Sequence, residues 1–230
     1  MPEFWLHPRR QAWLADGLFR GWRWASRLGT LGAGTRYARR FQAVGAGSAF
    51  AFPPGPSLGE RWIRIGDDSL IGPGVALSAG MWPDEPLDPP SGWIVRIGDR
   101  CNIGRGSAVV GRVGIDVGDD VTTGPNVYVT DHNHRYADPD LPVARQWVDE
   151  APVRIGAGCW LGAGAVVLPG TVLGRNVVVA AGSVVRGEVP DHSVVAGVPA
   201  RIVRRRNDDG TWDPPLDPPS GTARPPDGWY

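Results

Sequence analysis

The hydrophobic positions of this chain recur every six residues. From Ile155 to Pro190 the repeat is unbroken and reads IGAGCW, LGAGAV, VLPGTV, LGRNVV, VAAGSV and VRGEVP. An aliphatic residue opens each unit, and a small residue or Val stands at its fifth position. A period of six fits neither the stripe of an α-helix nor the alternation of a simple strand. The pattern predicts a chain wound into flat coils, with the aliphatic residues pointing into a shared core.

Less regular units with the same spacing precede this run. They open at Ile65, Ile71, Leu77, Ile97, Ile103, Val109, Val117, Thr123 and Val129, and the unit at Leu77 is degenerate. These nine units and the six later ones make fifteen in all. Many of the 33 glycines recur at fixed positions in the repeat. Such positions are typical of corner turns, where the backbone needs a positive φ or a close approach.

The repeat resembles that of the hexapeptide-repeat acyltransferases, and among them the galactoside and maltose O-acetyltransferases. The resemblance implies an all-β fold, a left-handed parallel β-helix in which three units make one triangular coil. Fifteen units then correspond to about five coils, which we place in a β-helix domain at residues 51–206. The left hand comes from the resemblance alone, since parallel crossovers are ordinarily right-handed.

The N-terminal residues 1–50 differ in composition from the repeats. Residues 1–40 hold eight arginines against Glu3 and Asp16, with four tryptophans among them. We expect a short helical segment that caps the end of the β-helix, where a sheet edge and the core would otherwise be exposed. The alternative is an interfacial helix within residues 1–45 that lies on an anionic membrane, which would make the protein membrane-peripheral.

Two segments interrupt the repeats. Residues 81–93 contain four prolines, which prevent ladder pairing and predict a loop outside the coils. Trp82 and Trp93 in this loop are candidates to stack on a sugar acceptor, although a plain surface loop explains them equally well. Residues 131–152 form a second excursion, and loops of this length in a compact domain are usually functional or disordered.

The C-terminal residues 207–230 hold many prolines and few aliphatic residues, which predicts a disordered tail. Its segment PLDPPSG, at 215–221, repeats residues 86–92 letter for letter. Shared Pro-rich composition is the simplest explanation of this duplication.

Composition narrows the function. The formal net charge is zero, which argues against a general nucleic-acid binder. All 24 basic side chains are Arg, so Schiff-base chemistry and a lysine base are excluded. No apolar run has the length of a membrane span, and the N-terminus lacks a secretory signal, so a cytoplasmic location is expected. Cys101 and Cys159 occupy fifth positions and are interpreted as small core residues; a catalytic thiol is the alternative.

Two of the four histidines open the second excursion, in the sequence TDHNH from Thr130 to His134. A neutral imidazole is the usual general base for an alcohol or amine near pH 7. In the resembling acetyltransferases a His at this place deprotonates the acceptor, and the match to PNVYVTDH assigns that role to His132. Supporting roles fall to His134 and Asp131, and an acceptor contact to Asn126. The residues alone leave Asp131, Asp149 and Glu150 as alternatives for orienting the imidazole.

The segment AGVPARIV, from Ala196 to Val203, looks like the signature that closes the β-helix in this family. The resemblance implies acetyl-CoA as the acyl donor, with no metal required, and a homotrimer with active sites between subunits. It assigns the donor site to Trp160, Ala163, Ala181, Arg201 and Arg204. For the two arginines the physical reason is clear, because guanidinium groups bind phosphate through paired hydrogen bonds.

The resemblance implies acyl transfer from acyl-CoA to a hydroxyl or amino group of a sugar or another small acceptor. It also implies direct attack by the acceptor, which fits a chain that offers no credible nucleophile. One alternative is a non-catalytic β-helix that binds partners through its faces. Another is a γ-class carbonic anhydrase, which needs three histidines around zinc. Apart from His7, only His132, His134 and His192 are available for such a site.

Overall fold

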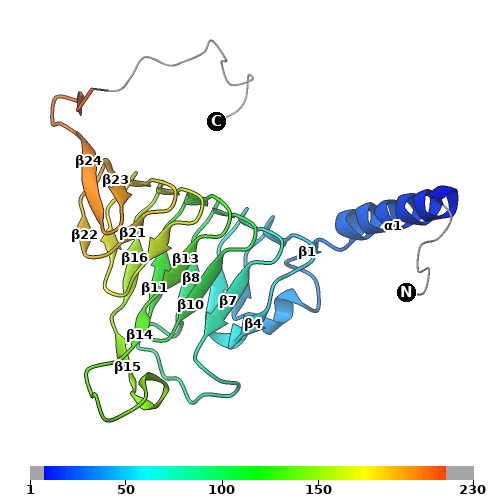
Figure 1. Cartoon of the computed structure of the whole chain (residues 1–230), viewed down its shortest axis with the longest axis horizontal. Coiled ribbons are helices and arrows are strands. Elements are labelled where there is room, and N and C mark those ends of the chain that lie inside the picture. The colour runs from blue at the N-terminus through cyan, green and yellow to red at the C-terminus, as the bar shows by residue number, and fades with distance from the viewer. Residues whose placement is uncertain (1–7, 216–230) are drawn as a thin grey trace.

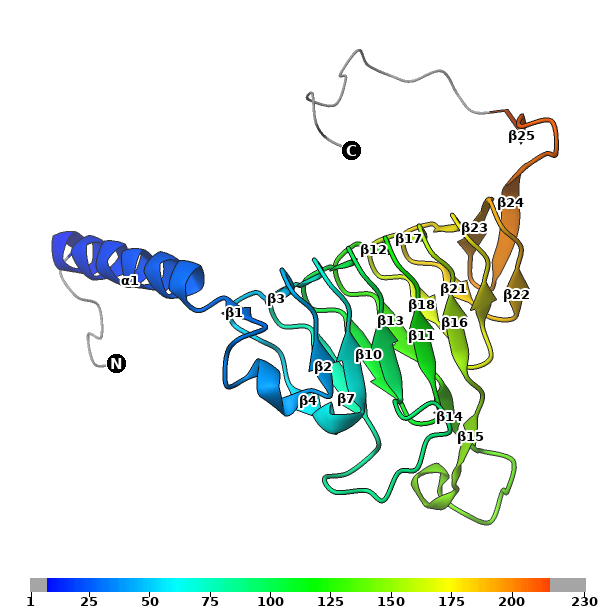
Figure 2. The same ribbon diagram turned by 180° about the vertical axis from the view of Figure 1, so that it is seen from behind.

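The six-residue units form short strands that stack into the three walls of a parallel β-helix. A computed structural model describes residues 8–215, and Figures 1 and 2 show its coils side by side. Each coil passes through wall B, wall A and wall C in that order. Strands in adjacent coils pair in parallel, as in the register that sets Ile65 beside Ile97.

The strands of each wall follow one another from coil to coil. Wall B consists of β2 (Ala43–Val44), β5 (Ile63–Ile65), β8 (Val95–Ile97), β11 (Ile115–Val117), β16 (Val153–Ile155), β19 (Val172–Leu173) and β22 (Glu188–Val189). Wall A consists of β3 (Ala49–Phe50), β6 (Leu70–Ile71), β9 (Asn102–Ile103), β12 (Thr122–Thr123), β17 (Trp160–Leu161), β20 (Val178–Val179) and β23 (Ser193–Gly197). Wall C consists of β4 (Ser57–Leu58), β7 (Ala76–Ala79), β10 (Ala108–Gly111), β13 (Tyr128–Thr130), β18 (Val166–Val167) and β21 (Val184–Val185).

Within residues 8–215 these strands make six complete coils, and a seventh reaches only walls B and A. The sequence pattern predicted about five coils, with the domain starting at residue 51. The additional first coil spans residues 43–58. It escaped the pattern because Phe50 takes an aliphatic position and three prolines stand between β3 and β4.

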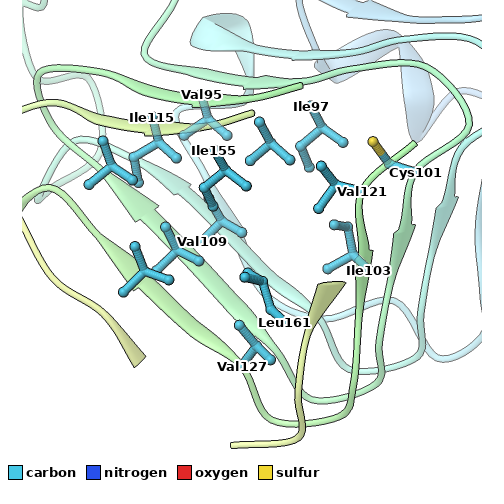
Figure 3. Packing of buried hydrophobic residues seen from close by; sticks show 14 of the residues in the cluster. Val95, Ile97, Cys101, Ile103, Val109, Ile115, Val121, Val127, Ile155 and Leu161 are labelled. Carbon is cyan, nitrogen blue, oxygen red and sulfur yellow. The ribbon is translucent and has the colours of Figure 1, made fainter. Parts of the chain in front are cut away.

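The aliphatic residues of successive coils stack in columns inside the prism. One column in wall B runs through Ile65, Ile97, Val117, Ile155 and Leu173, all at most 2% exposed. Figure 3 shows how side chains from the three walls meet in this interior. The fifth position of a unit lies at a corner of the prism, where little room is left. Cys101 and Cys159 occupy it, and both are buried free thiols.

The N-terminal helix α1 (Pro8–Leu28) extends away from the coils and does not cover their end (Figures 1 and 2). The end is closed instead by the segment that follows α1. In that segment Tyr37 and Phe41 pack on Phe50 of the first coil, with ring centroids 5.1 Å and 4.9 Å away. The short strand β1 (Leu31–Gly32) and the 3-10 helix η1 (Ala38–Arg40) belong to this cover. The expected cap therefore comes from residues after the helix, because only they present aromatic side chains to the core.

The other end of wall A continues into antiparallel strands. β24 (Ala200–Arg206) pairs with β23, and β25 (Trp212–Asp213) pairs with β24. The tail predicted from residue 207 thus begins with an ordered turn and strand. The rest of that prediction, together with the repeated segment at 216–221, lies outside the described residues.

Candidate active site

Both long excursions from the coils leave at corners between wall C and wall B, and one short turn lies between them. The first corner carries residues 80–94, which contain no helix or strand. The second is the short turn 112–114, and the third carries residues 131–152. The excursion at the third corner is a hairpin and not a plain loop, since β14 (His132–His134) pairs antiparallel with β15 (Val148–Glu150). Its tip contains the 3-10 helix η3 (Val143–Arg145). Figure 1 shows both excursions below the coils.

Asp131 and His132 form a hydrogen-bonded pair at the root of the hairpin. The Asp131 Oδ1 atom lies 2.9 Å from Nδ1 of His132. The Asp131 carboxylate is completely buried, whereas the His132 side chain is 15% exposed. Because Nδ1 faces the carboxylate, a neutral ring in this arrangement carries its proton there and leaves the Nε2 lone pair free to accept one.

The backbone of the middle corner holds the Asp131 carboxylate in place. The N–H groups of Arg112, Val113 and Gly114 all donate to it, at 2.9, 2.8 and 2.7 Å. Burial opposes ionisation and is the largest single influence on the pKa of Asp131. The hydrogen bonds from His132 and from these three N–H groups together outweigh it and lower that pKa below 3.8. Asp131 is therefore a fixed anion beside the imidazole.

The sequence left three candidates for orienting the imidazole, and only Asp131 is bonded to it. The Asp149 carboxylate is exposed and accepts a hydrogen bond from Arg135 at 2.5 Å. The Glu150 carboxylate faces Arg112. His134 is exposed on the hairpin, opposite Val148, and makes no comparable contact in the described part of the chain.

The Arg112 side chain joins the two excursions. Its guanidinium pairs with Glu85 of the first excursion at 3.1 Å and with Glu150 of the hairpin. It also lies over the ring of Trp147, 4.8 Å from the ring centroid. Glu85 is 5% exposed and Arg112 16%, so this ion pair is largely buried. Neither Arg112 nor Glu85 was predicted from the sequence. The only signal was the two-residue insertion that contains Arg112, in the turn between the units at Val109 and Val117.

The three candidate acceptor residues do not come together. Trp82 lies against Trp147, with ring centroids 6.4 Å apart, and lines a cavity of about 340 Å³ beside Arg61. Trp93 lines separate hollows along wall B. Asn126 is an exposed corner residue with φ of 59°, a left-handed conformation that Asn tolerates better than most residues. A pair of tryptophans stacking on one sugar is therefore not the arrangement found.

The five predicted donor-site residues lie along wall A and at its corner with wall C. Trp160 is 54% exposed on β17. Ala163 and Ala181 occupy the next corner in consecutive coils, where Gly182 N–H donates to the Ala163 carbonyl at 2.8 Å. Arg201 and Arg204 are on β24, whose partner β23 follows β20 in the same wall. The chain thus brings these residues to one edge of the β-helix.

His132 lies at the opposite edge of wall C from this group. Ala163 precedes the wall C strand β18, whereas His132 follows the wall C strand β13. About six residues of extended chain separate the two corners, which at about 3.3 Å per residue is roughly 20 Å. One protomer therefore does not bring the imidazole to the predicted donor-site residues.

Neither thiol is suited to act as a nucleophile. Burial is the largest influence on both, and it raises the pKa of Cys101 and raises that of Cys159 to about 11. Across residues 8–215 there is also no cluster of three His, Cys, Asp or Glu side chains that would hold a metal ion. Those residues therefore contain no ligand set for the zinc ion of a carbonic anhydrase. His192 is a corner residue away from the hairpin.

Comparisons with known proteins agree with this architecture. Two family models match: "bacterial transferase hexapeptide (six repeats)" over residues 152–187 and "hexapeptide repeat of succinyl-transferase" over residues 94–131. A solved structure of the N-acyltransferase AntD from Bacillus cereus covers 76% of this chain and 91% of its own, with a TM-score of 0.62 and 21% identity. A hexapeptide-repeat acetyltransferase of Vibrio cholerae, solved with acetyl coenzyme A, has a TM-score of 0.50 and 28% identity, with coverage of 75% and 77%.

Curated relatives are similar over part of their length. A probable acetyltransferase of Mycobacterium tuberculosis is 34% identical over 146 residues, which are 64% of this chain and 43% of the relative. The galactoside O-acetyltransferase of Escherichia coli is 30% identical over 139 residues, 58% of this chain and 65% of the relative. The chain thus spans less than two thirds of either relative.

The repeats and the fold define a β-helix of the transferase type. The matches are to hexapeptide-repeat transferases and acetyltransferases, and they support the resemblance that the sequence predicted. The prediction of a left-handed parallel β-helix is confirmed with it.

The buried anion at the hairpin root makes a prediction about pH. Because the pKa of Asp131 is below 3.8 in the folded chain, its carboxylate stabilises the fold above that pH, and this contribution is lost as the pH falls through the lowered pKa. We expect Asp131→Asn to reduce the free energy of unfolding by about 1.5–3 kcal/mol at pH 7. The deficit should shrink below pH 3.8 in urea unfolding. Asp149→Asn, at an exposed carboxylate, is the control. An equal deficit for Asp131→Asn at pH 7 and below pH 3.8 would show that Asp131 is not a stabilising anion.

The buried ion pair of Arg112 and Glu85 leads to a second prediction. Arg112→Met leaves the Glu85 carboxylate buried without its partner, which we expect to cost about 3–5 kcal/mol of unfolding free energy. Hydrogen exchange of backbone amides in residues 81–93 and 131–150 should accelerate together, because Arg112 contacts both excursions. Adding Glu85→Gln should restore part of the loss, since an amide needs no countercharge. Arg154→Met, at an exposed site on wall B, is the matched control. Faster exchange in one excursion only would show that Arg112 does not couple them.

Proposed function

We propose that this chain transfers an acetyl group from acetyl-CoA to a hydroxyl or amino group of a sugar or similar small acceptor. The observation that carries the proposal is the Asp131–His132 pair, a fixed anion bonded to the Nδ1 side of a partly exposed imidazole. Two further facts support it: the family includes a galactoside O-acetyltransferase that is 30% identical to this chain, and the Vibrio cholerae relative binds acetyl coenzyme A. The O-acetyltransferase relative favours a sugar hydroxyl over an amine.

In this proposal His132 is the general base. The acceptor hydroxyl gives its proton to Nε2, and its oxygen attacks the thioester carbonyl carbon of acetyl-CoA. Asp131 stabilises the imidazolium that forms, because the carboxylate already accepts the Nδ1 proton. The three backbone N–H groups that hold Asp131 keep the ring orientation constant through the proton transfer. Asp131 acts through His132 and is a positioning residue.

The attack produces a tetrahedral oxyanion, which backbone N–H groups of the coils are suited to stabilise. Collapse of this intermediate expels the CoA thiolate, and the His132 imidazolium returns the proton to it. Direct transfer of this kind needs no acyl-enzyme. It fits a chain without lysine in which both cysteine thiols are buried with raised pKa values.

The donor site in this proposal lies along wall A, with Trp160 beside the thioester, Ala163 and Ala181 along the pantetheine arm, and Arg201 and Arg204 at the phosphates. Within one protomer these residues and His132 are on opposite edges of wall C. We therefore assign the complete site to the junction between two subunits of a homotrimer, with the hairpin of one subunit facing the donor edge of the next. Trp147 belongs to the hairpin and Trp82 lies against it, and these two residues are the candidates for acceptor contact there.

The decisive experiment measures thiol release from acetyl-CoA with a panel of sugars and glycosides. We expect His132→Ala to lower kcat about 10²–10⁴-fold, the usual contribution of a general base. His134→Ala, two residues along the same strand, should stay within a few-fold of the wild type. Full activity of His132→Ala would remove the assignment. A wild-type chain that neither binds CoA nor releases thiol with any acceptor would favour the non-catalytic alternative.

The donor site is tested separately by Arg201 and Arg204 of β24. Arg201→Ala and Arg204→Ala should each raise the KM for acetyl-CoA by about tenfold or more with little change in the KM for the acceptor, because a charged hydrogen bond contributes about 1.5–3 kcal/mol. Arg186→Ala, at another exposed site on the same half of the β-helix, is the control. A rise in the acceptor KM alone would move the CoA site elsewhere.

A further inference from the structure

The helix α1 has almost no partner within the chain. It joins the β-helix at its C-terminal end, where Trp22 meets Phe52 with ring centroids 5.6 Å apart. The rest of the helix extends into solvent in both views (Figures 1 and 2). Large apolar side chains are left uncovered, with Trp13 72%, Leu18 76% and Phe19 60% exposed. An exposed set of this size marks an interaction surface.

The apolar residues of α1 share one face of the helix. Leu14, Leu18, Trp22 and Ala25 follow one another at spacings of three and four residues, which sets them in a stripe along one side. Phe19 borders the stripe. The helix is too polar to span a bilayer, and no helix among residues 8–215 is long and apolar enough to cross a membrane. An amphipathic helix of this kind lies along a surface.

The opposite face of α1 is cationic. Arg20, Arg23 and Arg27 repeat at three and four residues, and Asp16 is the single acidic residue of the helix. None of these arginines pairs with a carboxylate in the part of the chain that the structure describes. Trp13 and Trp24 lie between the arginines and the apolar stripe. Arginine side chains can reach lipid phosphates while the helix axis stays at the boundary, and tryptophans favour that depth.

We infer that α1 docks the protein on the surface of an anionic lipid bilayer. The apolar stripe enters the boundary between headgroups and acyl chains, and the arginines pair with lipid phosphates. A lipid surface uses the stripe, the tryptophans and the unpaired arginines together. A second copy of α1 would cover the stripe alone and leave the arginines without partners. This inference is independent of the acyl transfer proposed above, since it rests on a segment outside the coils.

Co-sedimentation of the full chain with vesicles tests it. We expect binding to vesicles that contain phosphatidylglycerol and little binding to pure phosphatidylcholine. Binding should weaken steeply as salt is raised, because the attraction is partly electrostatic. Equal binding to both kinds of vesicle, or to neither, would overturn the inference.

Two variants test the apolar face and the cationic face of α1 separately. Leu18→Glu should weaken binding at least about tenfold, since it removes a large apolar side chain from the stripe. Arg20→Glu/Arg27→Glu should weaken it about 25-fold or more, at roughly fivefold for each arginine near an anionic surface. Arg154→Glu/Arg186→Glu changes the net charge equally on the β-helix and is the matched control, with binding unchanged. Thermal unfolding of all variants should match the wild type because the altered side chains are exposed.

Sedimentation velocity without lipid tests the alternative that a second copy of the chain covers the apolar stripe. We expect the oligomeric state to be the same in wild type and Leu18→Glu. If Leu18→Glu dissociates an oligomer and the wild type does not bind vesicles, α1 is a contact between copies of the chain. The membrane inference is then wrong.

Discussion

The stacked ladder of the coils is the constraint on which the rest of this structure depends. Each coil forms backbone hydrogen bonds with the coil before and the coil after it. For example, Gly98 N–H donates to Val117 in the next coil at 2.9 Å, and Gly118 N–H donates to Ile155 in the coil after that at 2.8 Å. An insertion within a strand would leave buried N–H and C=O groups unpaired, at a cost of about 1–3 kcal/mol each. Excursions can therefore leave only at corners. The two long ones leave at the same corner of the prism, two coils apart, with one short turn between them.

That short turn is where the scaffold and the candidate site are joined. Its three backbone N–H groups hold Asp131, so the orientation of His132 depends on the coil below the hairpin. Its side chain Arg112 ties the hairpin to the first excursion through a buried ion pair. Buried charges are retained only where they are paired, so this cluster commits both excursions to one arrangement. Two segments that leave a rigid wall are thereby held in one defined arrangement around His132.

The residues of the candidate site that lie in one motif could be predicted from the sequence, whereas the contacts that form across coils could not. His132 could be singled out because histidine is scarce and PNVYVTDH resembles a motif of the acetyltransferases. Asp131 stayed one of three candidates, since only its contact with Nδ1 separates it from Asp149 and Glu150. Arg112 and Glu85 are 27 residues apart and share no pattern, so no local signal pointed to their pairing. Trp82 and Trp93 were both candidates to stack on a sugar because they lie in one loop, yet they line different cavities.

The sequence by itself determined that the chain is wound into stacked coils, because a six-residue period sets the aliphatic residues in a shared core and the glycines at the corners. The left hand of the coils came from the resemblance. It also indicated the resemblance to hexapeptide-repeat transferases and singled out His132 as the candidate base. The tertiary structure alone decided which carboxylate holds that histidine. It also decided that the predicted donor residues and the predicted base lie on opposite edges of one wall, and that α1 does not cover the end of the β-helix. These outcomes depend on contacts between residues far apart in the chain and on which side chains are needed to cover the core. A local repeat carries no information about those contacts or about that cover.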